Sequence, residues 1–142
     1  MKKTSGTPWN FAEEYSSPDG RYKLRFFNVG EVGMSAPLGG GCYLEFDGRG
    51  YELPGHFGGP VAWNEHSTKA ALPYWTKKRS QRLAVVDVEK MELLLSEEIF
   101  RVIQLSHFED ELICGVDSPI YLSEKIEFDL RRQPMGASVE IR

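Results

Sequence analysis

An all-β fold built from antiparallel sheets is predicted by three features of the sequence. The run Tyr22–Phe26 alternates apolar and polar residues, which suits a strand with one face in water. Turn residues of the Pro, Asp and Gly types separate such runs, first at Ser17–Gly20. An Asp-Gly step between aromatic residues indicates a tight hairpin. We expect propeller-like blades or a β-sandwich, with one short helix near residues 88–102 as an open alternative.

The first half of the chain supplies a strand, a hairpin and two glycine-rich loops. The strand is Tyr22–Phe26, after the first turn. The hairpin pairs Cys42–Phe46 with Tyr51–Leu53 across an Asp-Gly-Arg-Gly turn. Glycine-rich stretches at residues 30–41 and 55–60 are interpreted as loops or bulges.

More strands are expected in the second half of the chain. They are Val61–Trp63, Ala70–Trp75, Leu83–Val86, Leu112–Gly115, Ile126–Leu130 and Ala137–Ile141.

The segment from Val88 to Val102 permits two interpretations. Its apolar residues recur near helical spacing, and Asp87 is an acceptable helix N-cap. The same segment also reads as a hairpin, in which Leu83–Val88 and Met91–Leu95 pair across a Glu-Lys turn. The internal repeat favours the hairpin.

Two sequence marks repeat at intervals of about 40–45 residues, the period of a propeller blade with four short strands. Polar turn residues precede an apolar run at Ser17, Asn64 and Ser106. An apolar strand ends with an aspartate at Asp47, Asp87 and Asp129.

The stretch Ser17–Tyr22 resembles the S-P-D-G-x-apolar turn of TolB-like and WD-type β-propeller repeats. Trp63–Leu72 followed by Leu83–Asp87 is similar to the rest of such a blade. The resemblance covers residues 17–130 and implies three blade-like units. Because a ring needs four or more blades, either two chains share one ring or the strands form a sandwich or curled sheet.

Length and charge limit the remaining possibilities. The chain has 142 residues, and we expect an N-terminal arm over residues 1–16 and a single β domain over residues 17–142. A net charge of −4 argues against nucleic-acid binding, which needs clustered Lys and Arg. The chain has no apolar run of about 18 residues, so we expect no membrane association and a cytoplasmic location. An open sheet edge or a shared ring would produce a homo-oligomer.

Motifs for catalysis and cofactor binding are missing from the sequence. It contains neither a Walker-type phosphate loop nor a G-x-G-x-x-G fingerprint. Gly33–Pro37 begins like a nucleophile elbow, but Pro37 stands in place of the second glycine. Cys42 and Cys114 form no C-x-x-C pair. We therefore predict no catalytic residue, no cofactor and no metal.

Two groups of side chains remain as candidates for a binding site. Trp63, Tyr74 and Trp75 are aromatic residues of the kind favoured on binding surfaces, although they equally suit a core. Glu65 and His66 place a carboxylate beside an imidazole. If the fold brought the loop histidine His56 near them, the three could bind a metal.

The favoured function is a non-catalytic binding module for a protein partner. The general composition is similar to that of the small acidic immunity proteins of bacteria. One alternative is a small hydrolase or metal-binding enzyme that uses the loop His and Glu residues. The other is a carbohydrate or small-ligand binder that uses the aromatic group.

Overall fold

The computed structural model describes residues 3–141, and in that range it contains β-strands and no helix. The prediction of an all-β antiparallel fold is therefore confirmed. The twelve strands are β1 (Glu14–Ser16), β2 (Lys23–Glu31), β3 (Leu38–Phe46), β4 (Arg49–Glu52), β5 (Ala62–Trp63), β6 (Lys69–Trp75), β7 (Gln81–Asp87), β8 (Glu92–Phe100), β9 (Ile103–Glu109), β10 (Leu112–Asp117), β11 (Glu124–Asp129) and β12 (Met135–Glu140). Residues 1–2 of the expected arm and residue 142 of the expected domain lie outside the described residues. No helix in the described part of the chain could cross a membrane.

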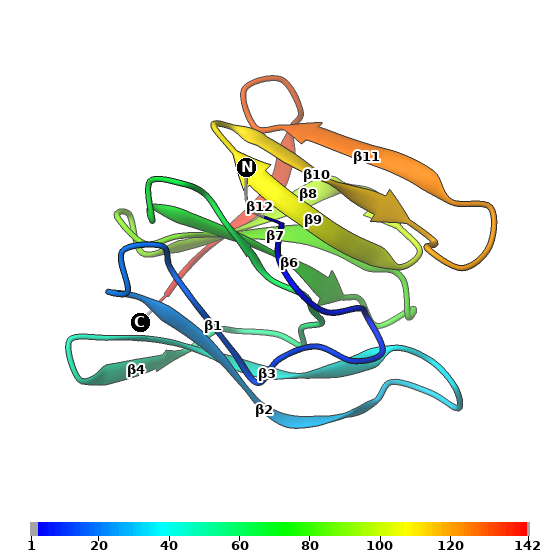
Figure 1. Cartoon of the computed structure of the whole chain (residues 1–142), viewed down its shortest axis with the longest axis horizontal. Helices are drawn as coiled ribbons and strands as arrows, with labels where there is room; N and C mark the ends of the chain where they lie inside the picture. Colours follow the sequence, from blue (N-terminus) through cyan, green and yellow to red (C-terminus); the bar gives the residue numbers. More distant parts are fainter. Residues whose placement is uncertain (1–2, 142) are drawn as a thin grey trace.

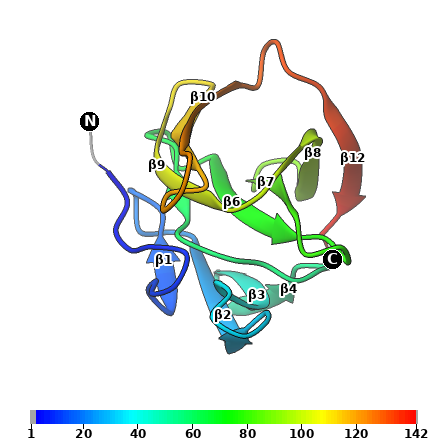
Figure 2. The same cartoon turned by 90° about the vertical axis from the view of Figure 1, so that its right-hand side faces the viewer.

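The strands form three separate sheets, which lie over one another as layers (Figure 1). The lower sheet has the order β1-β2-β3-β4, and the central sheet has the order β12-β8-β7-β6-β5. The third sheet, with the order β11-β10-β9, covers the other face of the central one. Figure 2 shows the chain arching from the third sheet to β12, the last strand of the central sheet.

The central sheet is buried on both faces, which explains the unbroken apolar run in β7. Leu83 and Val85 belong to the core shared with the three-stranded sheet. Ala84 and Val86 point the other way, into the core shared with the four-stranded sheet. Successive side chains of a strand alternate between its faces, so the part of β7 that lies between the two cores is apolar at successive positions.

Both predicted hairpins form, and the helix alternative for residues 88–102 is wrong. Asp47 and Gly48 both have positive φ, at 51° and 72°, as the tight turn between β3 and β4 requires. Between β7 and β8, the Asp87 carboxylate accepts hydrogen bonds from the amides of Glu89 (3.1 Å) and Lys90 (3.0 Å). These bonds stabilise a turn that reverses the chain before β8 begins.

Two strands are absent from the sequence-based prediction. One is β1, which pairs with β2 and buries Tyr15. The other is β9, which includes Ser106, the residue expected to open a turn. The residues before β1 also lie on the body of the protein, where the Thr4 amide donates to the Ser106 carbonyl at 2.7 Å.

The resemblance to a β-propeller is wrong, because the structure has stacked sheets of four, five and three strands instead of blades around an axis. Ser106, which should open the third unit, lies inside β9 and not in a turn.

The spacing of the repeated aspartates has another cause. Asp47, Asp87 and Asp129 follow or end β3, β7 and β11, one strand from each sheet, and all three strands run toward the same end of the molecule (Figure 1).

Apart from the long connection at residues 53–61, the turns fall into two groups at opposite ends of the strands (Figure 1). The polar end consists of the turns at residues 17–22, 47–48, 64–68, 88–91, 110–111 and 130–134. The tip end consists of the loops at residues 32–37, 76–80, 101–102 and 118–123. At the tip end, the Gln81 carboxamide oxygen accepts a hydrogen bond from the Ile103 amide at 2.6 Å, which joins the central sheet to the third sheet.

Candidate functional site

The aromatic group predicted from the sequence is divided between two places and packs mainly inward. Trp63 pairs with Ala70 at the start of β6, whereas Trp75 lies at the end of that strand. The Trp63 indole is half-buried, and its N–H donates to the Tyr15 carbonyl at 3.0 Å. Trp75 is only 6% exposed, and its indole N–H donates to the Leu38 carbonyl at 3.1 Å. Both indoles therefore have their polar atom satisfied inside the fold.

Tyr74 lies beside Trp75 in β6 and is half-buried. Its ring packs edge-on against Phe57, with ring centroids 5.5 Å apart. The three aromatic residues thus do not share one exposed face.

The three residues of the metal hypothesis are divided between the two ends of β6. His56 is exposed beside the end of that strand, where its carbonyl accepts a hydrogen bond from the Trp75 amide at 2.8 Å. Glu65 and His66 precede the other end of β6. The strand itself is seven residues long, which corresponds to about 20 Å between its ends. Within residues 3–141, no three His, Cys, Asp or Glu side chains are grouped so that they could hold a metal ion.

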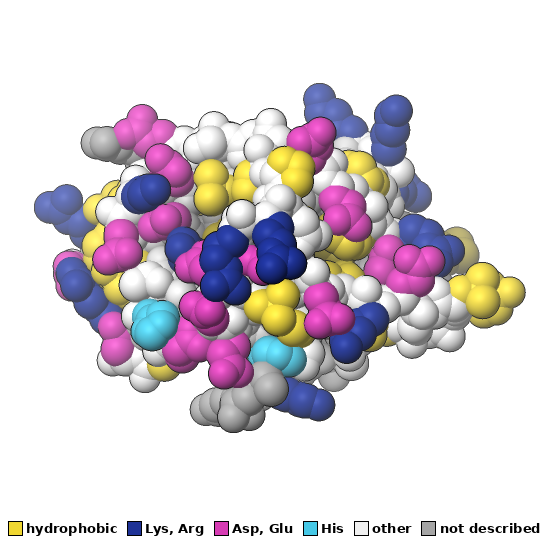
Figure 3. Space-filling model, turned by 90° about the horizontal axis from the view of Figure 1, so that it is seen from above, with side chains coloured by type: hydrophobic (Ala, Val, Ile, Leu, Met, Phe, Trp, Pro, Cys, Tyr) yellow, Lys and Arg dark blue, Asp and Glu magenta, His cyan; other side chains and the backbone are white. Residues whose placement is uncertain are grey.

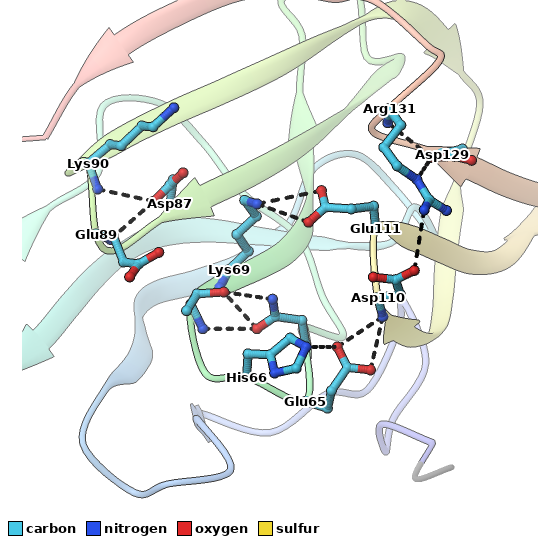
Figure 4. A network of polar contacts seen from close by, with 12 residues as sticks. Glu65, His66, Lys69, Asp87, Glu89, Lys90, Asp110, Glu111, Asp129 and Arg131 are labelled. Atoms are coloured by element: carbon cyan, nitrogen blue, oxygen red, sulfur yellow. Dashed lines mark hydrogen bonds and ion pairs between the residues drawn. The ribbon is translucent and has the colours of Figure 1, made fainter.

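Glu65 instead joins two layers at the polar end (Figure 4). Its carboxylate accepts a hydrogen bond from the Asp110 amide at 2.9 Å, which links the β5–β6 turn to the β9–β10 turn. The His66 imidazole lies 3.5 Å from the same carboxylate. This arrangement ties the β5–β6 turn to the β9–β10 turn.

Further ion pairs continue this network across the polar end (Figure 4). Lys69 contacts Glu111 at 3.2 Å, and Arg131 contacts both Asp110 and Asp129. Two hydrogen bonds from Arg131 lower the pKa of Asp129. The bond from the Arg131 amide has the larger effect, and the bond from its guanidinium has the smaller one. The polar end is thus held together by side chains of its own turns.

Neither cysteine has the lowered pKa of an activated thiol. Cys42 is buried in the core, and burial raises the pKa of its thiol. Partial burial, followed by the negative charge of Glu127, also raises the pKa of Cys114. A nucleophilic cysteine needs the opposite shift, because the thiolate is the reactive form.

The loop of the β10–β11 hairpin at the tip end carries three consecutive exposed large apolar residues. This loop, residues 118–123, carries Ile120, Tyr121 and Leu122, which are 76%, 72% and 68% exposed. Figure 3 shows hydrophobic side chains projecting from the end of the molecule where Figure 1 places this loop. We call these three residues the apolar tip.

The base of the loop is hydrogen-bonded to the neighbouring β8–β9 turn. The Asp117 carboxylate accepts hydrogen bonds from the amides of Arg101 (3.0 Å) and Val102 (2.9 Å). The Ser118 amide donates to the Val102 carbonyl at 2.8 Å, and the Ser123 hydroxyl donates across the loop to the Ser118 carbonyl at 2.7 Å. The fold therefore presents the apolar tip on a fixed base.

A groove of about 360 Å³ lies between the end of β8 and the neighbouring edge of β11. Its walls are Glu98–Phe100 on one side and Glu124–Phe128 on the other, with Gln133 also in contact. The groove begins next to the apolar tip, because β11 starts where the loop ends. The tip and the groove together form the candidate site.

Sequence reasoning did not select residues 118–123. The available signal was the run of three large apolar residues that follows Ser118-Pro119 and precedes Ser123. Such a run between turn residues is too short for a typical strand, so the pattern is compatible with a loop that exposes apolar residues. Comparison with protein-family models, with curated proteins and with solved structures gives no match to this chain.

Proposed function

We propose that this protein is a non-catalytic module that binds a protein partner through the apolar tip. The observation that carries the proposal is the exposure of three consecutive large apolar side chains on a braced loop. Burying side chains of this size against a partner contributes about 1.5–3 kcal/mol each. Tyrosine is also enriched among the residues that dominate binding energy at protein interfaces.

The backbone of the tip supports the same proposal. Leu122 has φ of 51°, in the left-handed region that disfavours side chains with a Cβ by roughly 1–2 kcal/mol. Its side chain is 68% exposed, so packing within the described chain offsets little of this strain. A strained residue that contributes little to the core is expected where the exposed side chain serves a function.

The test compares two variants that remove exposed apolar side chains from different loops. Immobilised wild-type protein should capture a defined set of proteins from an extract of the source cells, identified by mass spectrometry. The triple variant Ile120→Ser/Tyr121→Ser/Leu122→Ser should lose that set. Met34→Ser, which removes a side chain 96% exposed on the 32–37 loop, should retain it. Equal urea midpoints for all three proteins would show that folding is unaffected.

Two results would contradict the proposal. One is capture of the same proteins by the wild type and the triple variant. The other is flotation of the wild type, but not the triple variant, with vesicles of phosphatidylcholine and phosphatidylglycerol. That second result would make the tip a lipid contact.

A further inference from the structure

Most sheet edges of this fold are short or covered, and β11 is an exception. The edge strands β5, β1 and β4 have two, three and four residues. The edge of β9 is met by the N-terminal segment, where the Thr4 amide donates to Ser106. The two six-residue edges are β11 and β12. Each edge presents backbone donors and acceptors that another chain can pair with.

Of these two edges, β11 faces the groove. The groove exists because β8 extends beyond its neighbour: β12 begins opposite Ser96, which leaves Glu98–Phe100 without a strand on that side. The outer edge of β11 lies across from this stretch. Adjacent strands are about 4.8 Å apart, so an extended segment lying along β11 would continue the three-stranded sheet toward β8.

The charges along the groove are mainly negative. Its walls carry the carboxylates of Glu98, Asp117, Glu124 and Glu127, and the only amine is that of Lys125. Lys125 is already paired with Glu127 at 3.3 Å. Within residues 3–141, Glu98 and Glu124 make no ion pair. An occupant with Lys or Arg side chains would meet complementary charge.

Apolar contacts are available beside these charges. Ile99 in the groove is 56% exposed, and the apolar tip lies at the point where β11 begins. Alternate side chains of an added strand point to opposite faces, so one set can contact apolar residues while the other remains near the carboxylates.

We propose that β11 accepts an extended, basic segment of the partner protein as an added β-strand in the groove beside β8. The inference rests on the proposed protein-binding function and names the chemical class of the partner. Pairing with the β11 of a second copy is unfavourable, because it would bring the same acidic residues into the groove.

The probe for this proposal is a synthetic octapeptide of alternating lysine and valine. Titration into ¹⁵N-labelled full-length protein should shift the backbone amide signals of residues 98–100 and 124–128. An octapeptide of alternating glutamate and valine should not bind. Methylation of the backbone nitrogens of the lysine-valine peptide should abolish binding, because an added strand is held by main-chain hydrogen bonds.

Matched charge reversals test the role of the acidic walls. Glu98→Lys/Glu124→Lys should weaken the lysine-valine peptide at least roughly tenfold, because two attractions become repulsions. The control Glu52→Lys/Glu89→Lys makes the same change in net charge at exposed positions outside the groove and should bind like the wild type.

The strand-addition proposal is overturned if no peptide binds, if both double variants bind equally, or if backbone methylation has no effect. A stable dimer in light scattering that is lost in Glu98→Lys/Glu124→Lys would also overturn it, since the edge would then belong to a second copy. These failures are distinct from failure of the proposed function. If extract capture depends on the apolar tip but is unchanged in the groove variants, the proposed protein-binding function stands and the strand-addition proposal fails.

Discussion

The two ends of the stacked sheets differ in how their loops use side chains. At the polar end, Glu65, Lys69 and Asp87 are hydrogen-bonded or ion-paired within the chain. At the tip end, Ile120, Tyr121 and Leu122 project into water while only the base of their loop is braced. The turns at the polar end are thus tied together by contacts within the chain, whereas the apolar side chains of the tip loop stay exposed.

The largest expected effect is at the polar end, where Asn64 holds a turn. Its side chain is buried and accepts hydrogen bonds from the amides of Thr68 (2.9 Å) and Lys69 (3.1 Å). Asn64→Ala leaves both amides without this acceptor and should destabilise the protein by about 2–3 kcal/mol in urea unfolding. The exposed Asn10 is the control, and Asn10→Ala should change stability by less than about 0.5 kcal/mol. Equal losses of stability in the two variants would contradict the structural role assigned to Asn64 at the polar end.

A smaller effect of opposite sign is expected at the tip end. Leu122→Gly relieves a left-handed backbone and should stabilise the protein by about 0.5–1 kcal/mol, after the greater freedom of glycine in the unfolded chain is counted. The same variant should capture less partner, because an apolar contact is lost. Urea unfolding and extract capture measure the two effects. A loss of stability greater than about 1 kcal/mol would show that Leu122 packs within the chain.

The smallest effect concerns the pH dependence of the polar end. Hydrogen bonds from Arg131 lower the pKa of Asp129 in the folded protein. A carboxyl with a lowered pKa stabilises the fold above its unfolded value of about 3.9, and this stability disappears as the pH falls through the folded value. Asp129→Asn should therefore lower the urea midpoint at neutral pH, and the difference should close as the pH falls below the unfolded pKa and through the lowered folded pKa of Asp129. A difference that does not change with pH would show that this ionised contact contributes nothing.

Local sequence patterns predicted elements whose signal lies within a few residues. The Asp47-Gly48 step predicted its hairpin because the turn requires positive φ at both positions. The apolar run Leu83–Val86 predicted a strand, but not that both its faces are covered by other sheets. That information depends on which strands become neighbours, and a single strand does not contain it.

The errors in the prediction have the same origin. The spacing of Asp47, Asp87 and Asp129 is real, but it marks one strand end in each of three sheets and not three blades. The sequence left Trp75 open between a core and a binding surface and did not select Leu122; in the structure the tryptophan is buried and the leucine is exposed. Burial at such positions is decided by packing between layers, which local patterns do not encode.

The central claim is that partner binding belongs to the tip end and not to the polar end. Its most direct test places a photo-crosslinking phenylalanine analogue either at position 121 in the apolar tip or at position 89, which is exposed at the polar end. After irradiation in an extract of the source cells, crosslinks to a partner protein should form from position 121 and not from position 89. Equal crosslinking from both positions, or crosslinking from position 89 alone, would contradict the claim.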